Sequence, residues 1–181
     1  MLSLFLAMLD DEQDKKTFSE LYSKYNGKMF SIALTYTGDF HDAEEALQNA
    51  FVSVAKHIKD VKTDDELRLK SFLYKIVKNA AIDVAEKKKR YDFLALDEKI
   101  VSAETNPADL VEENEAVEKL TDFIATLSHK VRDVMVLNVI FELPPRKIAK
   151  ILNLNIHTVR SRITSGRKTL TGKINELEKN V

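Results

Sequence analysis

Hydrophobic residues recur every three or four positions along most of the chain, which is the spacing of helices that bury one face. In the first half this pattern predicts three helices, at about 16–36, 42–58 and 65–88. Gly38 is expected to end the first, because glycine adopts the left-handed backbone common after a last helical turn. Asp42 is expected to cap the second, since Glu45 follows three residues later.

The helical spacing returns after about residue 114. Two short periodic runs, 117–127 and 131–137, are each long enough for a helix, and Ser128 is placed to cap the second. Two further helices are predicted around a tight turn within 143–163. The C-terminal part is therefore expected to contain about four helices.

The predicted turn within 143–163 has the residues that a helix-turn-helix needs. Pro144 and Pro145 can begin a helix because its first N–H groups lack partners in any case. Asn153 tolerates the left-handed backbone of a sharp turn, and Asn155 can cap the helix that follows. The pattern predicts helix, short turn, helix.

Between these halves the periodicity fades, acidic residues accumulate and Pro107 interrupts the chain. This composition is typical of a flexible linker. We therefore predict an all-α fold with two small helical domains, 1–91 and 115–181, joined by a flexible acidic linker at 92–114. The C-terminal domain is the one that contains the helix-turn-helix.

Composition supports the helical class and narrows the chemistry. Four Gly, three Pro and no Trp among 181 residues are few for a protein built of strands and tight turns. The chain has no cysteine, which excludes disulfides and thiolate metal sites and fits a reducing compartment. The apolar run at 2–9 is too short to span a bilayer and lacks a basic leader. We expect a cytoplasmic protein without membrane insertion.

The net charge of −1 hides a strong segregation of charge along the chain. Residues 143–173 carry +8 and contain no Asp or Glu, residues 92–122 carry −8, and residues 86–90 carry +3. Two basic patches separated by an acidic connector indicate a polyanion bound at two places. The alternative is that these runs are ordinary solvated helix faces.

The second helix of the predicted helix-turn-helix has a face suited to DNA. At ~100° per residue, the side opposite its apolar stripe carries small polar and basic side chains. Such side chains can contact base edges and phosphates from a helix in the major groove. The alternative is a helical hairpin with a wet face. This face comprises His157, Thr158, Ser161, Thr164, Ser165 and Lys168, flanked by Arg160 and Arg162.

Catalysis has little support in the sequence. The four histidines are scattered without metal-ligand spacing, and there is neither a Gly-rich phosphate loop nor a Ser nucleophile motif. We predict that the protein is not an enzyme and that it needs no metal or other cofactor.

Several segments together resemble one family. Ser128-His-Lys-Val-Arg-Asp-Val-Met-Val-Leu, Lys147-Ile-Ala-Lys-Ile-Leu and Thr158-Val-Arg-Ser-Arg-Ile are similar to the fourth conserved region of bacterial RNA polymerase sigma factors of the extracytoplasmic-function group. Asp42-Ala-Glu-Glu-Ala-Leu-Gln-Asn-Ala-Phe resembles the polymerase-binding helix of their second region. Phe72-Leu-Tyr-Lys-Ile-Val-Lys-Asn-Ala-Ala-Ile-Asp resembles their promoter-melting helix. Ser165-Gly166-Arg167 departs from the Arg-Ala-Arg that often follows the recognition helix.

The resemblance implies a dissociable specificity subunit that directs core RNA polymerase to promoter DNA and is controlled by an anti-sigma factor. Its C-terminal domain would bind the upstream (minus 35) element, and its third helix would receive the downstream (minus 10) element as the strands separate. The implied upstream contacts are Arg146, Lys147, His157, Thr158, Arg160, Ser161, Arg162, Thr164 and Lys168. The implied downstream contacts are Lys78, Asn79, Asp83, Lys87, Lys88, Arg90 and Tyr91. The implied polymerase contacts are Asp42, Glu45, Gln48 and Asn49, facing away from the apolar stripe of their helix.

A stand-alone helix-turn-helix regulator, with an N-terminal sensor or dimerisation bundle, is the alternative. The segments 42–51 and 72–83 favour the sigma factor, because a sensor bundle needs neither a polymerase-docking helix nor a basic melting helix. The charge pattern further predicts that the acidic linker screens the DNA-binding surfaces of the free protein.

Overall fold

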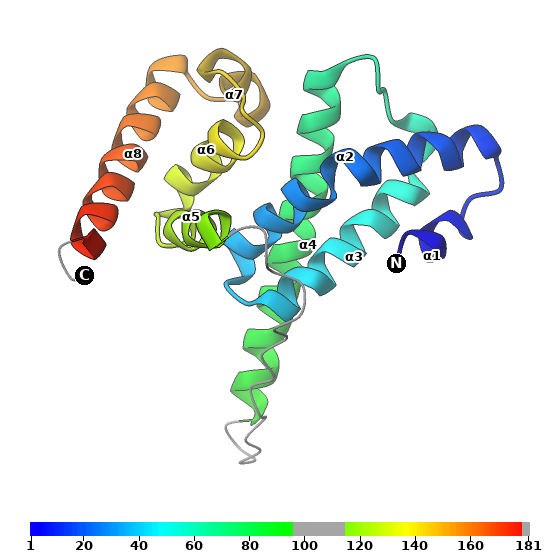
Figure 1. Ribbon diagram of the computed structural model, residues 1–181, viewed down its shortest axis with the longest axis horizontal. Coiled ribbons are helices and arrows are strands. Elements are labelled where there is room, and N and C mark those ends of the chain that lie inside the picture. The colour runs from blue at the N-terminus through cyan, green and yellow to red at the C-terminus, as the bar shows by residue number, and fades with distance from the viewer. Residues whose placement is uncertain (96–114, 179–181) are drawn as a thin grey trace.

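The computed structural model describes residues 1–95 and 115–178, and within them it contains eight α-helices, one short 3-10 helix and no strand. The predicted all-α fold is confirmed. The helices form two units, one from the first half of the chain and one from the second (Figure 1). Helix α4 belongs to the first unit, and its C-terminal end extends away from both.

The N-terminal unit is a bundle of three long helices with a short helix at its start. Helices α2 (Glu12–Thr37), α3 (Phe40–Lys56) and α4 (Glu66–Ala95) pack against one another in all three pairs. The short elements are α1 (Leu2–Leu6) and η1 (Ile58–Asp60). The predicted stripes supply the core: Phe18, Met29, Ala50 and Leu73 are fully buried. The three predicted helices are thus confirmed.

The junction between α2 and α3 is built by two consecutive residues. Gly38 has φ 70°, as predicted for the residue after a helix, and its N–H donates to Leu34 O at 2.9 Å. The N-cap of α3 is Asp39 rather than the predicted Asp42, because extended backbone at Asp39 aims its carboxylate at the Asp42 N–H, 2.9 Å away. Helix α3 therefore begins two residues earlier than expected, at Phe40.

Two features of the N-terminal unit were not predicted. Helix α1 buries Phe5, whose ring centroid lies 5.7 Å from Phe18 and 5.8 Å from Phe51. Helix α4 continues to Ala95, past the expected end at Lys88 and into the predicted linker. The rest of that linker, 96–114, lies outside the described residues, as does the predicted screening by it.

The C-terminal unit has the four helices expected from the sequence. They are α5 (Glu115–Ala125), α6 (His129–Val139), α7 (Pro145–Leu152) and α8 (Ile156–Glu178). Between α7 and α8, Asn153 adopts the predicted left-handed backbone, with φ 51° and ψ 50°, and Asn155 Oδ1 accepts from the His157 N–H at 2.8 Å. Ser128 does precede α6, but its side chain makes no capping hydrogen bond.

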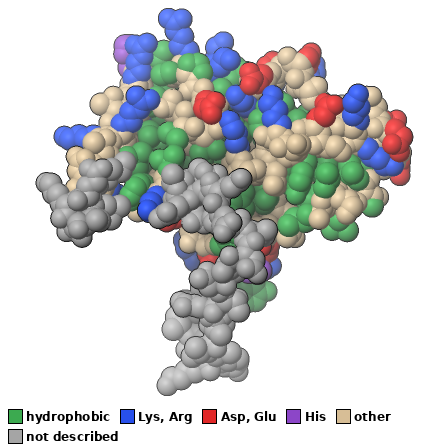
Figure 2. Space-filling view, viewed as in Figure 1, with side chains coloured by type: hydrophobic (Ala, Val, Ile, Leu, Met, Phe, Trp, Pro, Cys, Tyr) green, Lys and Arg blue, Asp and Glu red, His purple; other side chains and the backbone are tan. Residues whose placement is uncertain are grey.

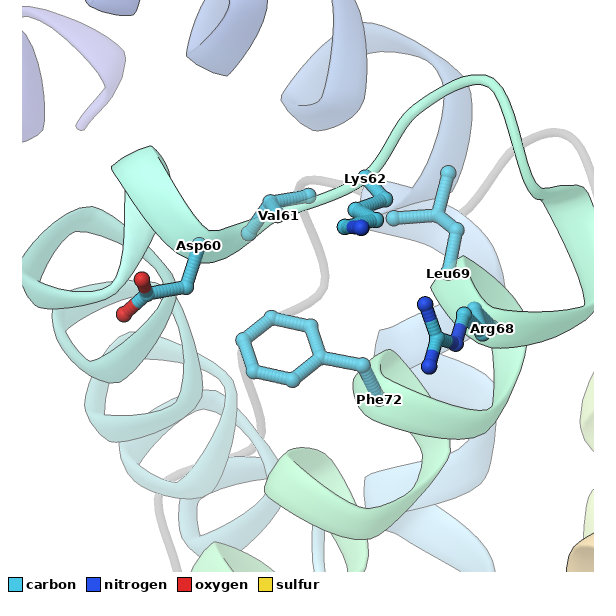
Figure 3. A pocket seen from close by; sticks show the side chains of 6 residues that line it. All are labelled: Asp60, Val61, Lys62, Arg68, Leu69 and Phe72. Carbon is cyan, nitrogen blue, oxygen red and sulfur yellow. The ribbon is translucent and has the colours of Figure 1, made fainter.

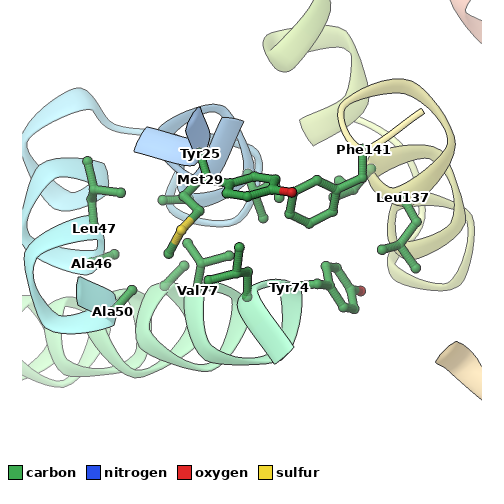
Figure 4. Close-up of a cluster of buried hydrophobic side chains, with 14 of the residues drawn as sticks. Tyr25, Met29, Ala46, Leu47, Ala50, Tyr74, Val77, Leu137 and Phe141 are labelled. Carbon is green, nitrogen blue, oxygen red and sulfur yellow. The ribbon is translucent and has the colours of Figure 1, made fainter. Parts of the chain in front are cut away.

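The two units share one hydrophobic core. Helix α5 packs on α2, and Phe141, just after α6, is fully buried. The rings of Phe141 and Tyr25 meet edge-on with centroids 6.2 Å apart (Figure 4). None of the helices in the described part of the chain is apolar over a length that could cross a membrane. The direct contact between units was not foreseen from the sequence.

Candidate nucleic-acid interface

Helix α8 presents the polar face that the sequence predicted. Val159, Ile163 and Leu170 are buried against the rest of the C-terminal unit. On the other side, His157, Arg160, Ser161, Thr164, Ser165 and Lys168 are exposed, and Thr158 is half-buried. Figure 2 shows Lys and Arg side chains gathered over the end of the molecule where α7 and α8 meet.

The remaining predicted upstream residues flank this face. Arg146 and Lys147 are exposed in the first turn of α7, where their positive charges lie on the helix that packs against α8. Arg162 is half-buried and donates to Lys130 O at 3.4 Å, so that its guanidinium lies against α6. A phosphate contact from Arg162 therefore has to share the guanidinium with this carbonyl.

The packing of α8 on α6 explains why residue 166 is a glycine, which the sequence alone did not reveal. It is buried where α8 crosses α6, and a Cβ at this position would lie 2.6 Å from Met135 Cγ and 3.2 Å from Val131 Cγ1. A side chain there would displace the buried Met135 side chain or move the two helices apart. The departure from the family pattern at 165–167 thus has two parts. Gly166 is required by packing, and Ser165 is exposed and neutral.

On α4, Asn79 and Asp83 are exposed side by side, one turn apart. They line a hollow of about 450 Å³ between α3 and α4. The hollow combines amide, hydroxyl, imidazole and carboxylate groups with an apolar wall, and Tyr91 is not part of it. Its lining consists of Asn49, Ser53, His57, Phe72, Ile76, Asn79, Ala80 and Asp83.

A second hollow, of about 410 Å³, lies at the start of α4 (Figure 3). Lys62 and Arg68 supply positive charge beside the ring of Phe72, and Asp60, Val61 and Leu69 complete the lining. Phe72 borders both hollows. Phe72 is only half-buried, although it lies in the apolar spacing of the helix predicted at 65–88.

A stripe of exposed and half-buried residues along α4 was not predicted from the sequence. Counting back from Asp83 and Asn79 in steps of three and four leads to Lys75, Phe72 and Arg68. Lys75 and Arg68 are exposed. The helical phase of Asn79 would have been sufficient to find these residues.

The basic end of α4 is paired with the start of α3. Lys88 Nζ lies 2.7 Å from Asp42 Oδ2 and 3.8 Å from Asp39 Oδ2, and Lys87 Nζ lies 3.3 Å from Glu45 Oε1. Nearby, Arg90 and Tyr91 are exposed. Two of the expected downstream contacts are thus ion-paired with two of the expected polymerase contacts.

The predicted orientation of Asp42 is wrong. Asp42 is only 9% exposed, and its carboxylate points toward α4 rather than away from the bundle. The cause is the earlier start of α3, which makes Asp42 a first-turn residue on the buried side. Glu45 is half-buried, whereas Gln48 and Asn49 are exposed as expected.

Lys78 lies apart from the other predicted downstream residues. It is adjacent to Asn79 in sequence, but the ~100° step per residue turns it toward the C-terminal unit. There its Nζ lies 2.8 Å from Asp133 Oδ2, and its side chain is only 18% exposed. In this conformation Lys78 contacts protein rather than solvent.

The two helical units correspond to two known protein regions. A family model for sigma-70 region 2 matches residues 21–91, and one for sigma-70 region 4 matches residues 118–170. The chain belongs to the extracytoplasmic-function (ECF) sigma factors of RNA polymerase. A sigma-70 region 2 in the N-terminal half does not favour the alternative of a stand-alone regulator with a sensor bundle.

Relatives and solved structures agree with this assignment. The chain is 29% identical to the ECF RNA polymerase sigma factor SigW of Bacillus subtilis, over 91% of this chain and 92% of SigW. It is 28% identical to SigM of the same organism, over 88% and 96% of the two chains.

The fold is similar to that of two proteins solved with bound partners, one of them a sigma factor. RpoE of Bartonella quintana, in complex with the anti-sigma factor NepR, has a TM-score of 0.65 and 18% identity, covering 88% of this chain and 98% of RpoE. CnrH, in complex with the cytosolic domain of CnrY, has a TM-score of 0.61 and 16% identity, covering 97% and 95%. At these identities the likeness concerns the fold.

Proposed function

We propose that this ECF sigma factor binds core RNA polymerase in the cytoplasm, directs it to specific promoters and helps to open the downstream element, without catalytic activity of its own. The observation that supports the proposal is the presence of two separate surfaces whose side chains suit nucleic acid. One is the exposed face of α8 over 157–168, which contains no Asp or Glu, and the other is the stripe and hollows of α4.

The C-terminal unit is proposed to dock α8 in the major groove of the upstream element. Arg160, Ser161 and Thr164 lie at the centre of the exposed face and would contact bases. Phosphates would be bound by residues at its edges, which fix the register of the helix. These are Arg146, Lys147, Arg162 and Lys168, with His157 and Thr158 at the start of α8.

The stripe of α4 is proposed to bind the downstream element as a single strand. A base that leaves the stack needs a pocket and replacement hydrogen bonds. The hollow beside Asn79 and Asp83 offers both, and Phe72 offers a ring edge or face for stacking. Lys87, Lys88, Arg90 and the exposed Tyr91 would follow the strand beyond it.

The exposed side of α3 is proposed to bind core polymerase. Glu45, Gln48 and Asn49 remain accessible there, whereas Asp42 acts by holding Lys88. Because RpoE was solved with an anti-sigma factor, we also propose that an inhibitor of this class controls the present chain.

The test is transcription in vitro with core polymerase on promoters selected by the reconstituted holoenzyme. Arg160→Ala should reduce initiation on linear duplex promoters in line with the ~1–3 kcal/mol of one base contact, and Asn79→Ala with Asp83→Ala should allow binding but prevent opening. A template with a pre-melted downstream element should rescue the α4 variant and not Arg160→Ala. Initiation by core enzyme alone at the same sites would overturn the proposal.

A further inference from the structure

A carboxylate from the C-terminal unit is inserted into a cluster of donors on the N-terminal unit. Asp133, in α6, accepts a hydrogen bond from Tyr36 Oη at 2.6 Å and pairs with Lys78 Nζ at 2.8 Å. The hydroxyl of Tyr74 lies 3.3 Å from that of Tyr36. We call Tyr36, Tyr74 and Lys78 the donor cage.

The donor cage is held in place before any ligand arrives. The ammonium of Lys78 lies 5.6 Å from the ring centroid of Tyr36 and 5.7 Å from that of Tyr74, so both rings fix its position. Burial, followed by the neighbouring Tyr74 and Asp133 groups, raises the pKa of Tyr36 far above its usual value. Burial is also the main reason that the pKa of Tyr74 is raised. Both hydroxyls therefore stay protonated and can donate.

The cage has the chemistry of an oxyanion site. A carboxylate and a phosphate diester offer similar charged oxygen acceptors to an ammonium and hydroxyl donors. The side chains of Asp133 and Lys78 are 16% and 18% exposed, so little water competes with their pairing. Such a site binds an anion through charge and hydrogen bonds, without regard to sequence.

The position of the cage relates it to the proposed path of the downstream strand. Lys78 is the neighbour of Asn79, which lines the hollow between α3 and α4. The two side chains are ~100° apart around α4, so a strand whose base enters that hollow can direct its backbone to Lys78 only when the C-terminal unit has moved away. We propose, resting on the proposed function, that the donor cage binds a phosphate of single-stranded DNA and that Asp133 occupies it in the free protein.

Occupation by Asp133 makes DNA binding at the cage depend on separation of the two units. Other contacts between the units support the closed form: Lys70 Nζ donates to Phe141 O at 3.2 Å, and Phe141 packs on Tyr25. Loss of the Asp133 charge is therefore expected to shift the equilibrium rather than to abolish packing. A strand phosphate and Asp133 compete for the same donors.

The experiment measures binding of the full chain, without polymerase, to a fluorescent single-stranded oligonucleotide of random sequence at low and moderate salt. Asp133→Asn keeps the size of the side chain and removes its charge, and should raise affinity up to about tenfold if a tenth of the wild type is open. The matched control is Asp122→Asn, an exposed residue of α5, which makes the same charge change away from the cage.

Lys78→Met distinguishes the two proposed roles of the cage, which are to hold Asp133 and to bind a DNA phosphate. It also breaks the pair with Asp133, but it should weaken binding and lower the salt slope by about 0.7, the value for one single-strand phosphate contact. Lys16→Met, at an exposed position of α2, is its matched control. Tyr36→Phe in the Asp133→Asn background should weaken binding as well.

Separation of the units is measured independently of DNA binding, as a distance between two spin labels. Because the chain has no cysteine, Lys59→Cys and Lys150→Cys provide two unique sites for spin labels on opposite units. Asp133→Asn should lengthen the measured distance, and circular dichroism melting checks that the variant is folded. An unchanged distance, affinity equal to Asp122→Asn, or equal binding by Lys78→Met and Lys16→Met would overturn the proposal. Since no polymerase is present, these outcomes are independent of transcription activity.

Discussion

At the scale of single residues, two positions set the geometry on which both proposed DNA surfaces depend. Asp39 fixes where α3 begins, and Asn153 fixes the turn into α8. Both act through the backbone: one satisfies a free helical N–H, and the other adopts a conformation that most residues avoid. Neither contacts the bases in our proposal, yet each positions side chains that do.

Replacing Asp39 by Ala should reduce the free energy of unfolding by about 1 kcal/mol, the usual cost of losing an N-cap. Asp39→Asn keeps a side-chain acceptor and should cost less. Urea unfolding followed by circular dichroism measures both. If the two variants are equally stable, the charge of Asp39 beside Lys88, and not the cap, is the source of its effect.

Asn153→Ala should destabilise the chain by about 1 kcal/mol, since alanine meets the same Cβ contact at φ 51° as asparagine but lacks the short polar side chain that can hydrogen-bond locally. Asn153→Gly should be close to neutral because glycine has no Cβ. Thermal melting is the measurement, and a glycine variant less stable than the alanine variant would contradict this account.

At the scale of helices, the sequence was informative because each long helix buries one stripe, and that stripe recurs with the helical period. The same signal is weak for α1, which has five residues and is held by Phe18 and Phe51 rather than by a pattern of its own. Tyr36 lies in the apolar spacing that predicts the helix at 16–36. Periodicity shows that such a residue is covered, but not that α6 of another unit covers it.

Two variants on the exposed face of α8 should affect DNA binding differently, one through specificity and the other through overall affinity. Arg160→Ala should cost ~1–3 kcal/mol on the preferred promoter and relax selectivity there. Lys168→Ala, a phosphate contact, should weaken all sequences alike and lower the salt slope by about one unit. Fluorescence anisotropy on specific and random duplexes distinguishes them, and equal losses on both duplexes for Arg160→Ala would remove its proposed role.

On α3, Glu45 is both a proposed polymerase contact and the partner of Lys87. Glu45→Gln should weaken binding to core polymerase while leaving the fold intact, because an accessible helix position contributes little to stability. Lys87→Met removes the other half of the ion pair and is the control. If both variants lose core affinity equally, Glu45 acts by positioning α4 rather than by touching polymerase.

At the scale of the whole molecule, the contact between the units is the feature that periodicity and charge could not supply. The predicted electrostatic screening relied on the acidic linker, whereas the described contacts run directly from α2 and α4 to α5, α6 and Phe141. These contacts leave the polar face of α8 exposed while the donor cage is occupied. In the proposed scheme, upstream DNA can therefore meet an exposed α8 while the donor cage is still occupied by Asp133.

The contact between Tyr25 and Phe141 tests whether this arrangement exists in solution. Phe141 is fully buried and Tyr25 is 1% exposed, although they belong to different units. An edge-on aromatic pair contributes ≈ 0.5–1.5 kcal/mol beyond the area it buries. Tyr25→Ala, Phe141→Ala and the double variant should therefore show a coupling free energy of about 1 kcal/mol in urea unfolding of the full chain. Strict additivity of the two single effects would mean that the units unfold without sensing each other, because side chains that do not touch have no interaction to lose.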